Sequence, residues 1–345
     1  AQLRARLRAP HAHRAQLPLG CALWPHASKF AAMAAAATKA AWAAATAVAS
    51  KSAAVDLERR RDGNMRLQQH VYAQNTNHAG LSPACAFRDA SIIVQTDEQT
   101  LDMFCNWLHH YRQLKLPNPV YVVAYGSAAG KVGARNFENV SFVAPPRMDR
   151  LGGARGGDGG IGAQNFGSSA FYALNTAKIK VAAQLVRSTR RPVVFTDVDT
   201  ALRRDPFALL QDLFAALPPS KVFAIAPDQN ERDPLRTGVC ACFFAACASH
   251  AGERVLHRWW NASGGFASTV NEQKAFNRMV DKEPELLAGP VALLPYTHFP
   301  TGHGNPPLRP SVAMVHANWV RGHDAKVKRL RAHKLWRDGA CADFQ

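Results

Sequence analysis

From about Asp89 onward, short apolar runs alternate with stretches of helical length. The runs are rich in Val, Ile and Phe, which favours strands. The expected strands are Ser91–Gln95, Val120–Tyr125, Val140–Val143, Val193–Thr196, Val222–Ala226, Val239–Phe244, Val291–Leu294 and Val312–Val315; the expected helices are Asp97–Leu114, Ser168–Arg187, Ala246–Trp260 and Asn271–Val280. This alternation predicts an α/β fold, with a mostly parallel twisted sheet flanked by helices and a ligand site at the carboxyl ends of its strands.

The expected strand Val193–Thr196 runs directly into two aspartates, Asp197 and Asp199. Because side chains of a strand alternate between its faces, residues two apart share a face, so both carboxylates are expected on one side where the strand ends. Two like charges held together need a cation. Hard oxygen ligands suit Mg²⁺ or Mn²⁺, with a substrate diphosphate completing the coordination.

Two enzyme classes place such an Asp-x-Asp motif after a strand. Phosphatases of the haloacid dehalogenase type use the first Asp as nucleophile, which would be Asp197 here. They also need a hydroxyl two positions after the second Asp, where this chain has Ala201. Sugar-nucleotide transferases of the GT-A fold instead carry the motif in mid-domain, as in this chain. The transferase class fits better, and the phosphatase is kept as an alternative.

The chain has 345 residues, 47% of them hydrophobic, which is enough to bury a sizeable core. Residues 1–55 contain no acidic side chain and are rich in Ala and Arg. We therefore expect a basic leader over residues 1–66 and a single domain over residues 67–345. The leader fits a secretory signal that starts at Met33 and ends in Ala47-Val-Ala49, a membrane anchor, an organelle transit peptide or a disordered tail.

The formal net charge is +17, from 42 Lys and Arg against 25 Asp and Glu. A basic chain can bind nucleic acid, which makes a nucleic-acid-binding protein a second alternative. The excess charge, however, lies mostly toward the two ends, and no interleaved aromatic residues or recognised module accompany it. We therefore expect no nucleic-acid partner.

Seven cysteines are too few for a disulfide scaffold, and they lack the paired spacing of a zinc site. Cys240 and Cys242 lie in an apolar run where alternation points both to one face, so buried thiols are expected there.

Asn139-Val-Ser141 and Asn261-Ala-Ser263 match the acceptor pattern for N-glycosylation, which is compatible with a secretory lumen. The glycine-rich segment 151–162 is expected to be a loop, or more sharply a mobile lid.

A series of short motifs follows in order along the chain: Leu101-Asp-Met-Phe-Cys-Asn106-Trp107, Lys178, Phe195-Thr-Asp197-Val-Asp199, Arg204-Asp-Pro-Phe207, Thr237-Gly238, Asn271-Glu272-Gln273, Phe299-Pro-Thr-Gly302, Val315-His316-Ala-Asn318-Trp319, Lys326 and Leu335-Trp336. Each motif is weak alone, but their order and spacing are specific. Together they resemble the nucleotide-diphospho-sugar transferase family, which includes plant and algal rhamnogalacturonan xylosyltransferases and extensin arabinosyltransferases. The similarity runs from about Ser91 to Trp336.

The resemblance implies roles for the site residues. Asp199 would ligate Mn²⁺ or Mg²⁺ directly, Asp197 would hold it through water or grip the donor ribose, and His316 would be the third protein ligand. Glu272 would be a catalytic residue at the start of a helix, where a carboxylate is favoured. Donor contacts are implied at Lys178, Asp197, Thr237, Gly238, Gln273 and Lys326, with Lys326 as the diphosphate partner.

Two positions depart from the family pattern. Glu272 stands where Asp is more frequent, and Arg236 stands where Asn is frequent. Asp228 and Asp233, which follow the strand Val222–Ala226, could contact the sugar or the acceptor, but solvated loop carboxylates are expected instead.

The function that the resemblance implies is a metal-dependent GT-A glycosyltransferase. It would move a pentose or galactose from a nucleoside diphosphate, above all UDP, to a hydroxyl of a glycan or glycoprotein. Retention of anomeric configuration needs no dedicated base, whereas inversion would use Glu272 or Asp228. The expected location is the Golgi or secretory lumen, with membrane attachment through the leader, or alternatively an organelle reached by a transit peptide.

Overall fold

The computed structural model describes residues 83–133, 139–143, 169–230, 233–268, 270–301 and 308–344. All of them belong to the second of two units of the chain, residues 57–345. The predicted leader over residues 1–66 and the glycine-rich segment 151–162 lie outside the described residues.

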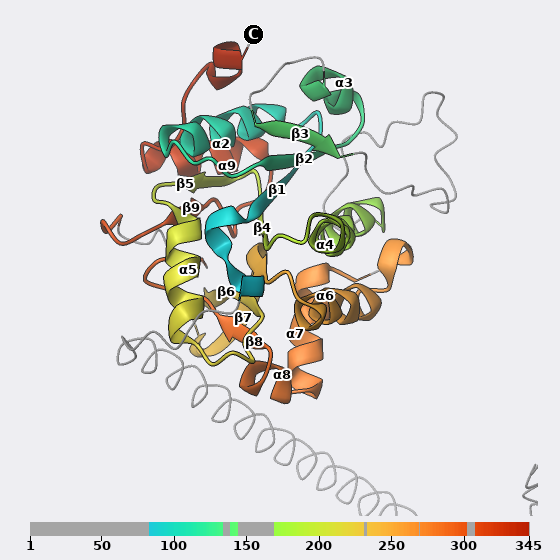
Figure 1. Cartoon of the computed structure of the whole chain (residues 1–345). Helices are drawn as coiled ribbons and strands as arrows, with labels where there is room; N and C mark the ends of the chain where they lie inside the picture. Colours follow the sequence, from blue (N-terminus) through green and yellow to red (C-terminus); the bar gives the residue numbers. More distant parts are fainter. Residues whose placement is uncertain are drawn as a thin grey trace, which may run out of the picture. The chain divides into compact units, whose positions relative to one another are not determined.

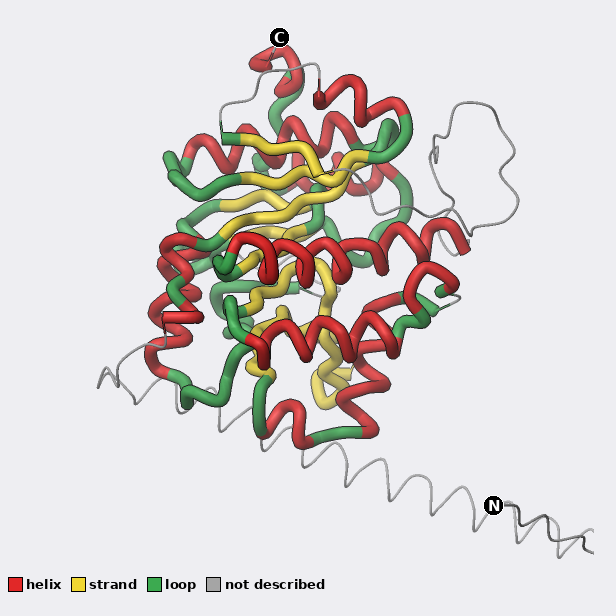
Figure 2. The backbone as a smooth tube through the Cα atoms, turned by 45° about the vertical axis from the view of Figure 1, so that its right-hand side comes forward, coloured by secondary structure: helices red, strands yellow, loops and turns green. Residues whose placement is uncertain are grey.

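A sheet runs through the centre of this unit and is covered by helices on both faces (Figures 1 and 2). Its strands are β1 (Ser91–Thr96), β2 (Val120–Ala124), β3 (Val140–Val143), β4 (Val193–Thr196), β6 (Phe223–Asn230), β7 (Asp233–Ala246) and β8 (Val291–Leu293), in the order β3-β2-β1-β4-β7-β6-β8. The neighbours pair in parallel, except that β7 runs antiparallel to both β4 and β6. The predicted α/β class with a mostly parallel sheet is confirmed.

The helices are α2 (Leu101–Gln113), α3 (Ser127–Gly133), α4 (Ser169–Thr189), α5 (Pro206–Ala216), α6 (His250–Ala262), α7 (Glu272–Lys282), α8 (Glu285–Ala288) and α9 (His323–Ala332), with short 3₁₀ turns at Pro83–Cys85, Phe87–Asp89, Gly265–Ala267 and Ala340–Phe344. Alternation along β4 divides the core: Val194 packs with α2 and α5, whereas Val193 and Phe195 pack with α4, α6 and α7. Among the described helices, none is both long and apolar enough to cross a membrane.

Four predicted helices and eight predicted strands occur in the structure, but several details differ. The helix expected from Ala246 begins only at His250, because β7 extends to Ala246 and the Ser249 hydroxyl caps the helix by accepting from the Gly252 amide. Helix α5 was not predicted, although Asp205 caps it and proline occupies its first turn. Helix α9 and the short strand β5 (Thr200–Leu202) were also missed.

A separate two-stranded sheet completes the fold beside the aspartate motif. The expected strand Val312–Val315 forms only over Met314–His316 (β9), and it pairs antiparallel with β5 rather than joining the main sheet. The register places Thr200 opposite His316. This pairing brings a residue from near the C-terminus next to Asp199.

The cysteines correct one prediction. Instead of free buried thiols, the structure has the disulfides Cys85–Cys247, Cys105–Cys341 and Cys240–Cys242, with sequence separations of 162, 236 and 2. Pairing depends on which residues the fold brings together, and the two long-range bonds join segments that no local pattern connects. The seventh cysteine, Cys21, lies outside the described residues.

Candidate active site

The aspartate motif lies where β4 ends at the middle of the sheet. The Asp197 amide donates to the Cys242 carbonyl of β7 at 2.9 Å, and the Thr200 hydroxyl donates to the Asp197 carbonyl at 2.7 Å. These bonds fix a tight turn between β4 and β5. The Asp199 side chain is 5% exposed and the Asp197 side chain 31% exposed, so the two carboxylates share a site but differ in access to solvent.

His316 contacts both carboxylates through one nitrogen. Its Nε2 lies 3.2 Å from Asp199 Oδ1 and 3.8 Å from Asp197 Oδ2, while its Nδ1 lies 3.8 Å from Cys240 Sγ. The side chain is almost fully buried. The structure therefore brings together the three side chains that the resemblance implied as metal ligands.

Lys326, on α9, approaches the same carboxylate from the other side. Its Nζ lies 2.5 Å from Asp199 Oδ2, with one third of the lysine side chain exposed. Burial raises the pKa of the Asp199 carboxyl, but Lys326 and His316 outweigh burial and hold that pKa well below its usual range. Asp199 is therefore ionised at neutral pH, and the partly exposed ammonium group of Lys326 balances its charge.

Asp197 is paired with a different cation. The Lys178 Nζ, on α4, lies 3.5 Å from Asp197 Oδ1 and 3.1 Å from Glu272 Oε1, and it donates to the Ala241 carbonyl at 3.0 Å. It also lies 4.6 Å from the centre of the Phe195 ring. Burial lowers the pKa of Lys178, but the two carboxylates raise it further, so the net shift is upward.

Lys178 is only 1% exposed, which makes it an internal counterion. Its contact with a bound donor, implied by the resemblance, stays a prediction. Glu272 is the first residue of α7, as expected, and its side chain is also buried. Its Oε2 has no hydrogen-bond partner among the described groups, so this helix start holds a buried acceptor next to the aspartates.

A hydrogen-bonded chain links Gln273 to the C-terminal segment. The Gln273 side chain accepts from the Ala241 amide at 3.2 Å and donates to Asp228 Oδ2 at 2.9 Å. Asp228 Oδ1 accepts from Trp319 Nε1 at 3.1 Å and from Asn318 at 3.5 Å. Asp228 is buried, so the expectation of a solvated loop carboxylate was wrong: β6 extends through this position and pairs with β7.

Gly238 has a packing role in addition to its implied donor contact. A Cβ atom there would lie 3.3 Å from the Asn277 side-chain oxygen, and that same oxygen accepts from the Val239 amide. Glycine therefore lets α7 lie close against β7. The side chains of Asp233, Arg236 and Thr237 lie outside the described part of the structure, as does Gly302.

The donor set fits a divalent cation. One oxygen each from Asp197 and Asp199 and one nitrogen of His316 lie within 4.8 Å of one another. Carboxylate oxygens and imidazole nitrogen suit Mn²⁺, and the carboxylates also suit Mg²⁺. Lys326 neutralises Asp199 in this arrangement, so the site already balances one of the two aspartate charges without a metal.

The sequence matches the model of the nucleotide-diphospho-sugar transferase family over residues 140–330. The chain belongs to this family and is a glycosyltransferase, as its motifs predicted. Nothing in these matches supports the phosphatase or the nucleic-acid-binding alternative, and Ala201, which replaces the required hydroxyl, is buried within β5.

Curated relatives share the larger part of the chain. UDP-D-xylose:L-fucose alpha-1,3-D-xylosyltransferase 3 of Arabidopsis thaliana is 26% identical over 272 residues, which cover 73% of this chain and 67% of that protein. A second xylosyltransferase of the same plant, numbered 1, is 23% identical over 266 residues, with 71% and 70% covered. The chain thus spans about two thirds of the length of these relatives.

Solved glycosyltransferases align with this chain at low identity and with low TM-scores. The galactosyltransferase LgtC, in complex with donor and acceptor sugar analogues, aligns with a TM-score of 0.42 and 14% identity over 73% of this chain and 95% of its own. Mouse xyloside xylosyltransferase 1 aligns with a TM-score of 0.39 and 13% identity over 61% of this chain and 86% of its own. The family assignment rests on the sequence match.

Proposed function

We propose that this enzyme transfers xylose, or another pentose or galactose, from a UDP-sugar to a hydroxyl of a glycan or glycoprotein in a metal-dependent reaction. The observation that carries the proposal is the buried Asp199, held between His316 and Lys326 at the carboxyl end of β4. The relatives' names support UDP-xylose as the first donor to try.

Asp197, Asp199 and His316 would hold Mn²⁺ or Mg²⁺, which as a Lewis acid stabilises the negative charge of a departing diphosphate. Lys326 would leave Asp199 Oδ2 and pair with the diphosphate. Its partial exposure and flexible four-carbon stem suit this movement, because the ammonium can swing without disturbing α9. Lys178 would stay in place and keep Asp197 and Glu272 oriented.

We infer that the reaction retains anomeric configuration. Inversion needs a general base, and the two candidates are already engaged: Glu272 pairs with Lys178, and both oxygens of Asp228 accept hydrogen bonds. Asp228 is therefore poorly placed to take a proton, whereas Glu272 is engaged through Oε1 alone. We propose that Glu272 Oε2, which has no partner among the described groups, instead accepts from a hydroxyl of the bound sugar. Thr237, Gly238 and Gln273 remain proposed donor contacts.

Trp319 is the proposed acceptor platform. It is 47% exposed, although its indole N–H is tied to the buried Asp228. Its backbone has φ 60°, an uncommon conformation for a bulky residue. An exposed aromatic ring fixed in this way can stack on the apolar face of a sugar ring. Asp228 connects this ring to Gln273 by hydrogen bonds.

We propose a secretory compartment such as the Golgi lumen. Two disulfides with sequence separations of 162 and 236 fit an oxidising environment, because the cytosol keeps such thiols reduced. Asn139 and Asn261, the two N-glycosylation acceptors, are both exposed. Membrane attachment through the leader remains a proposal about residues outside the described ones.

The deciding experiment is calorimetric titration of the full chain with UDP and a panel of UDP-sugars, with and without Mn²⁺. We expect Mn²⁺-dependent UDP binding that is lost in Asp199→Ala, together with loss of sugar transfer. Asp212→Ala is the matched control, because Asp212 is an exposed carboxylate on α5 outside the site. UDP binding and transfer that persist in Asp199→Ala would refute the proposed site.

A further inference from the structure

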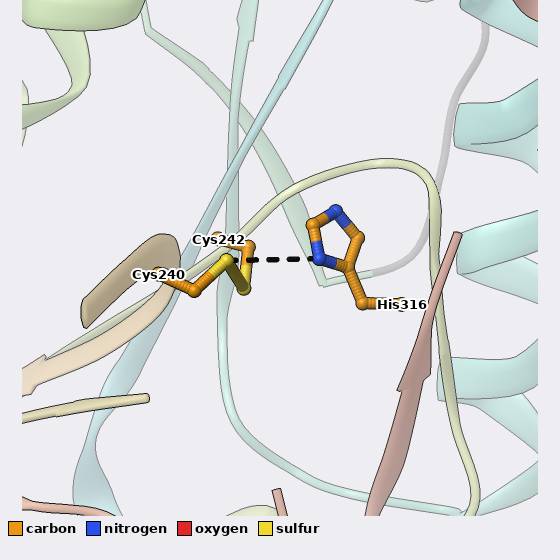
Figure 3. Close-up of side chains that lie close together, drawn as sticks. All are labelled: Cys240, Cys242 and His316. Atoms are coloured by element: carbon orange, nitrogen blue, oxygen red, sulfur yellow. Dashed lines mark hydrogen bonds between the residues drawn. A yellow bond between two sulfur atoms is a disulfide. The ribbon is translucent and has the colours of Figure 1, made fainter. Parts of the chain in front are cut away.

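The Cys240–Cys242 pair lies directly beside His316. Both cysteines are 2% exposed, and alternation along β7 points both toward the imidazole ring. Figure 3 shows the ring of His316 facing the sulfur pair. The His316 Nδ1 lies 3.8 Å from Cys240 Sγ. The Asn318 amide also donates to Cys240 Sγ at 3.7 Å.

This disulfide is not needed to hold the fold together. In the chain-entropy view, a crosslink stabilises a protein more when it closes a longer loop. Cys240–Cys242 spans a separation of 2, against 236 for Cys105–Cys341. In addition, hydrogen bonds to β4 and β6 already fix β7 on both sides. A chemical role is therefore a better explanation of this sulfur pair than a structural one.

His316 stands between two sets of ligands. Its Nε2 faces Asp197 and Asp199, and its Nδ1 faces Cys240. A neutral imidazole carries a proton on one nitrogen and a lone pair on the other. It can therefore ligate a cation on the carboxylate side or on the sulfur side, but not on both at once.

We propose that reduction of Cys240–Cys242 creates a second metal site, formed by the two sulfurs and His316 Nδ1, for a thiophilic divalent cation such as Zn²⁺ or Cd²⁺. The three ligand atoms lie within 4.8 Å of one another. A tetrahedral zinc site with Zn–S and Zn–N bonds of about 2.3 and 2.0–2.1 Å places sulfur and nitrogen about 3.6 Å apart. The 3.8 Å between Cys240 Sγ and His316 Nδ1 nearly matches this value.

The chemistry balances with a dithiol as reductant. The dithiol passes two electrons and two protons to the disulfide, is itself oxidised to a disulfide, and leaves two thiols on β7. Coordination then releases both thiol protons to solvent. The Asn318 amide stabilises the resulting thiolate of Cys240, because hydrogen bonds to charged acceptors are the stronger ones.

The site has a regulatory consequence that rests on the proposed function. In the oxidised protein, a cation beside Asp199 would take the Nε2 lone pair, and the ring proton would then lie on Nδ1, which faces the sulfur pair. In the reduced protein, the thiophilic ion takes the Nδ1 lone pair, and Nε2 carries the proton instead. The same imidazole therefore couples the redox state of β7 to donor binding.

The test uses Cd²⁺, whose thiolate complexes absorb in the ultraviolet. Full-length protein is titrated with Cd²⁺ before and after treatment with a dithiol, and alkylation with mass spectrometry identifies which cysteines were reduced. Cys240→Ser/Cys242→Ser is the control, because it keeps the other five cysteines. We expect the reduced protein to bind one more Cd²⁺ than the reduced control, with a cadmium–thiolate band.

Equal Cd²⁺ binding and absorption in the protein and the control, or resistance of Cys240–Cys242 to the dithiol, would overturn the proposal. A second measurement addresses regulation: Cd²⁺ at the new site should weaken Mn²⁺-dependent UDP binding by at least the roughly 10- to 100-fold that follows loss of a group that orients a metal ligand. Unchanged UDP affinity would overturn the coupling alone. Absence of UDP binding by the oxidised protein would count against the proposed function and leave the cadmium result standing.

Discussion

The two aspartates of the site are neutralised in opposite ways. Asp197 faces Lys178, which is sealed in the core at 1% exposure and shared with Glu272. Asp199 faces Lys326, which is 33% exposed and comes from α9 near the C-terminus. The buried carboxylate thus has the partly exposed cation, and the more exposed carboxylate has the buried one.

This difference separates two tasks. A fixed cation in the core holds the backbone of the motif and the start of α7 in position, but it cannot follow a substrate. Lys326 neutralises Asp199 in this arrangement, and we propose that it would move to a diphosphate in the metal-loaded enzyme. We therefore expect losses at Lys178 to appear mainly in stability and losses at Lys326 mainly in turnover.

Replacing Lys178 should have the largest effect. Lys178→Met leaves Asp197 and Glu272 without their shared counterion in a buried site, which should lower the free energy of unfolding by about 3–5 kcal/mol. Denaturant unfolding measures this change. Lys180→Met on the same helix is the control, because Lys180 is partly exposed and its Nζ lies over the Trp260 ring. Similar losses of unfolding free energy in both variants would remove the distinction between the buried Lys178 and the partly exposed Lys326.

Replacing Lys326 should affect turnover instead. Lys326→Met removes one charged group from the departing diphosphate, so kcat should fall by roughly 10²- to 10³-fold. Stability with Mn²⁺ present should change less than in Lys178→Met, because the metal replaces the ammonium beside Asp199. Lys328→Met, exposed on the same helix, should keep its activity. Normal kcat in Lys326→Met would return this residue to a structural role.

Trp319→Ala tests the acceptor side of the site. Loss of the ring should raise the acceptor KM by about tenfold, equivalent to about 1.4 kcal/mol of binding, and leave the Kd for UDP unchanged. Phe142→Ala is the control, since Phe142 on β3 is the other exposed large hydrophobic residue in the described part of the chain. A change in UDP affinity with normal acceptor kinetics would place Trp319 on the donor side.

The smallest effect concerns the anchoring of α9. His323 Nε2 lies 2.8 Å from Asp102 on α2, and its Nδ1 lies 3.1 Å from Asp324. Partial burial lowers the pKa of His323, but bonds to Asp324 and Asp102 outweigh burial and raise it above its ordinary value. The contact therefore stabilises the fold fully below about pH 6.5 and loses that effect as the pH rises through the raised pKa.

Because these groups are partly exposed, the contribution should stay below about 1 kcal/mol. Comparing the Tm of the wild type with that of His323→Gln from acid to mildly alkaline pH measures it. The wild type should have the higher Tm at acid pH, with the gap closing as the pH rises. A gap that widens with pH would contradict the assigned protonation.

Much of the fold could be predicted because its signals are local. The strand Val193–Thr196 combines apolar side chains with β-branched residues, and the predicted limits match β4. Strand β5 has only three residues, too few to show a period, and it forms because β9 pairs with it. Helix α5 carried a readable signal, since Asp205 and Pro206 form a helix start.

The site residues also fall into two groups, those with a local sequence signal and those placed by tertiary contacts. Asp197 and Asp199 were predicted from the strand that precedes them, whereas His316 and Lys326 were suggested only by resemblance, because tertiary pairing brings them there. The burial of Asp228 could not be read from its loop-like neighbours, since it depends on Gln273 and Trp319 far along the chain. The disulfides also depend on such distant contacts.

The Cys105–Cys341 bond makes most of the enzyme a covalent ring. A single proteolytic cut anywhere between these two residues leaves the fragments joined, and the C-terminal fragment keeps its attachment to Cys105 through Cys341. The segment with His316 and Lys326 would then stay tethered after a nick upstream of it. Nicked enzyme would therefore run as one species on a non-reducing gel and as two on a reducing gel.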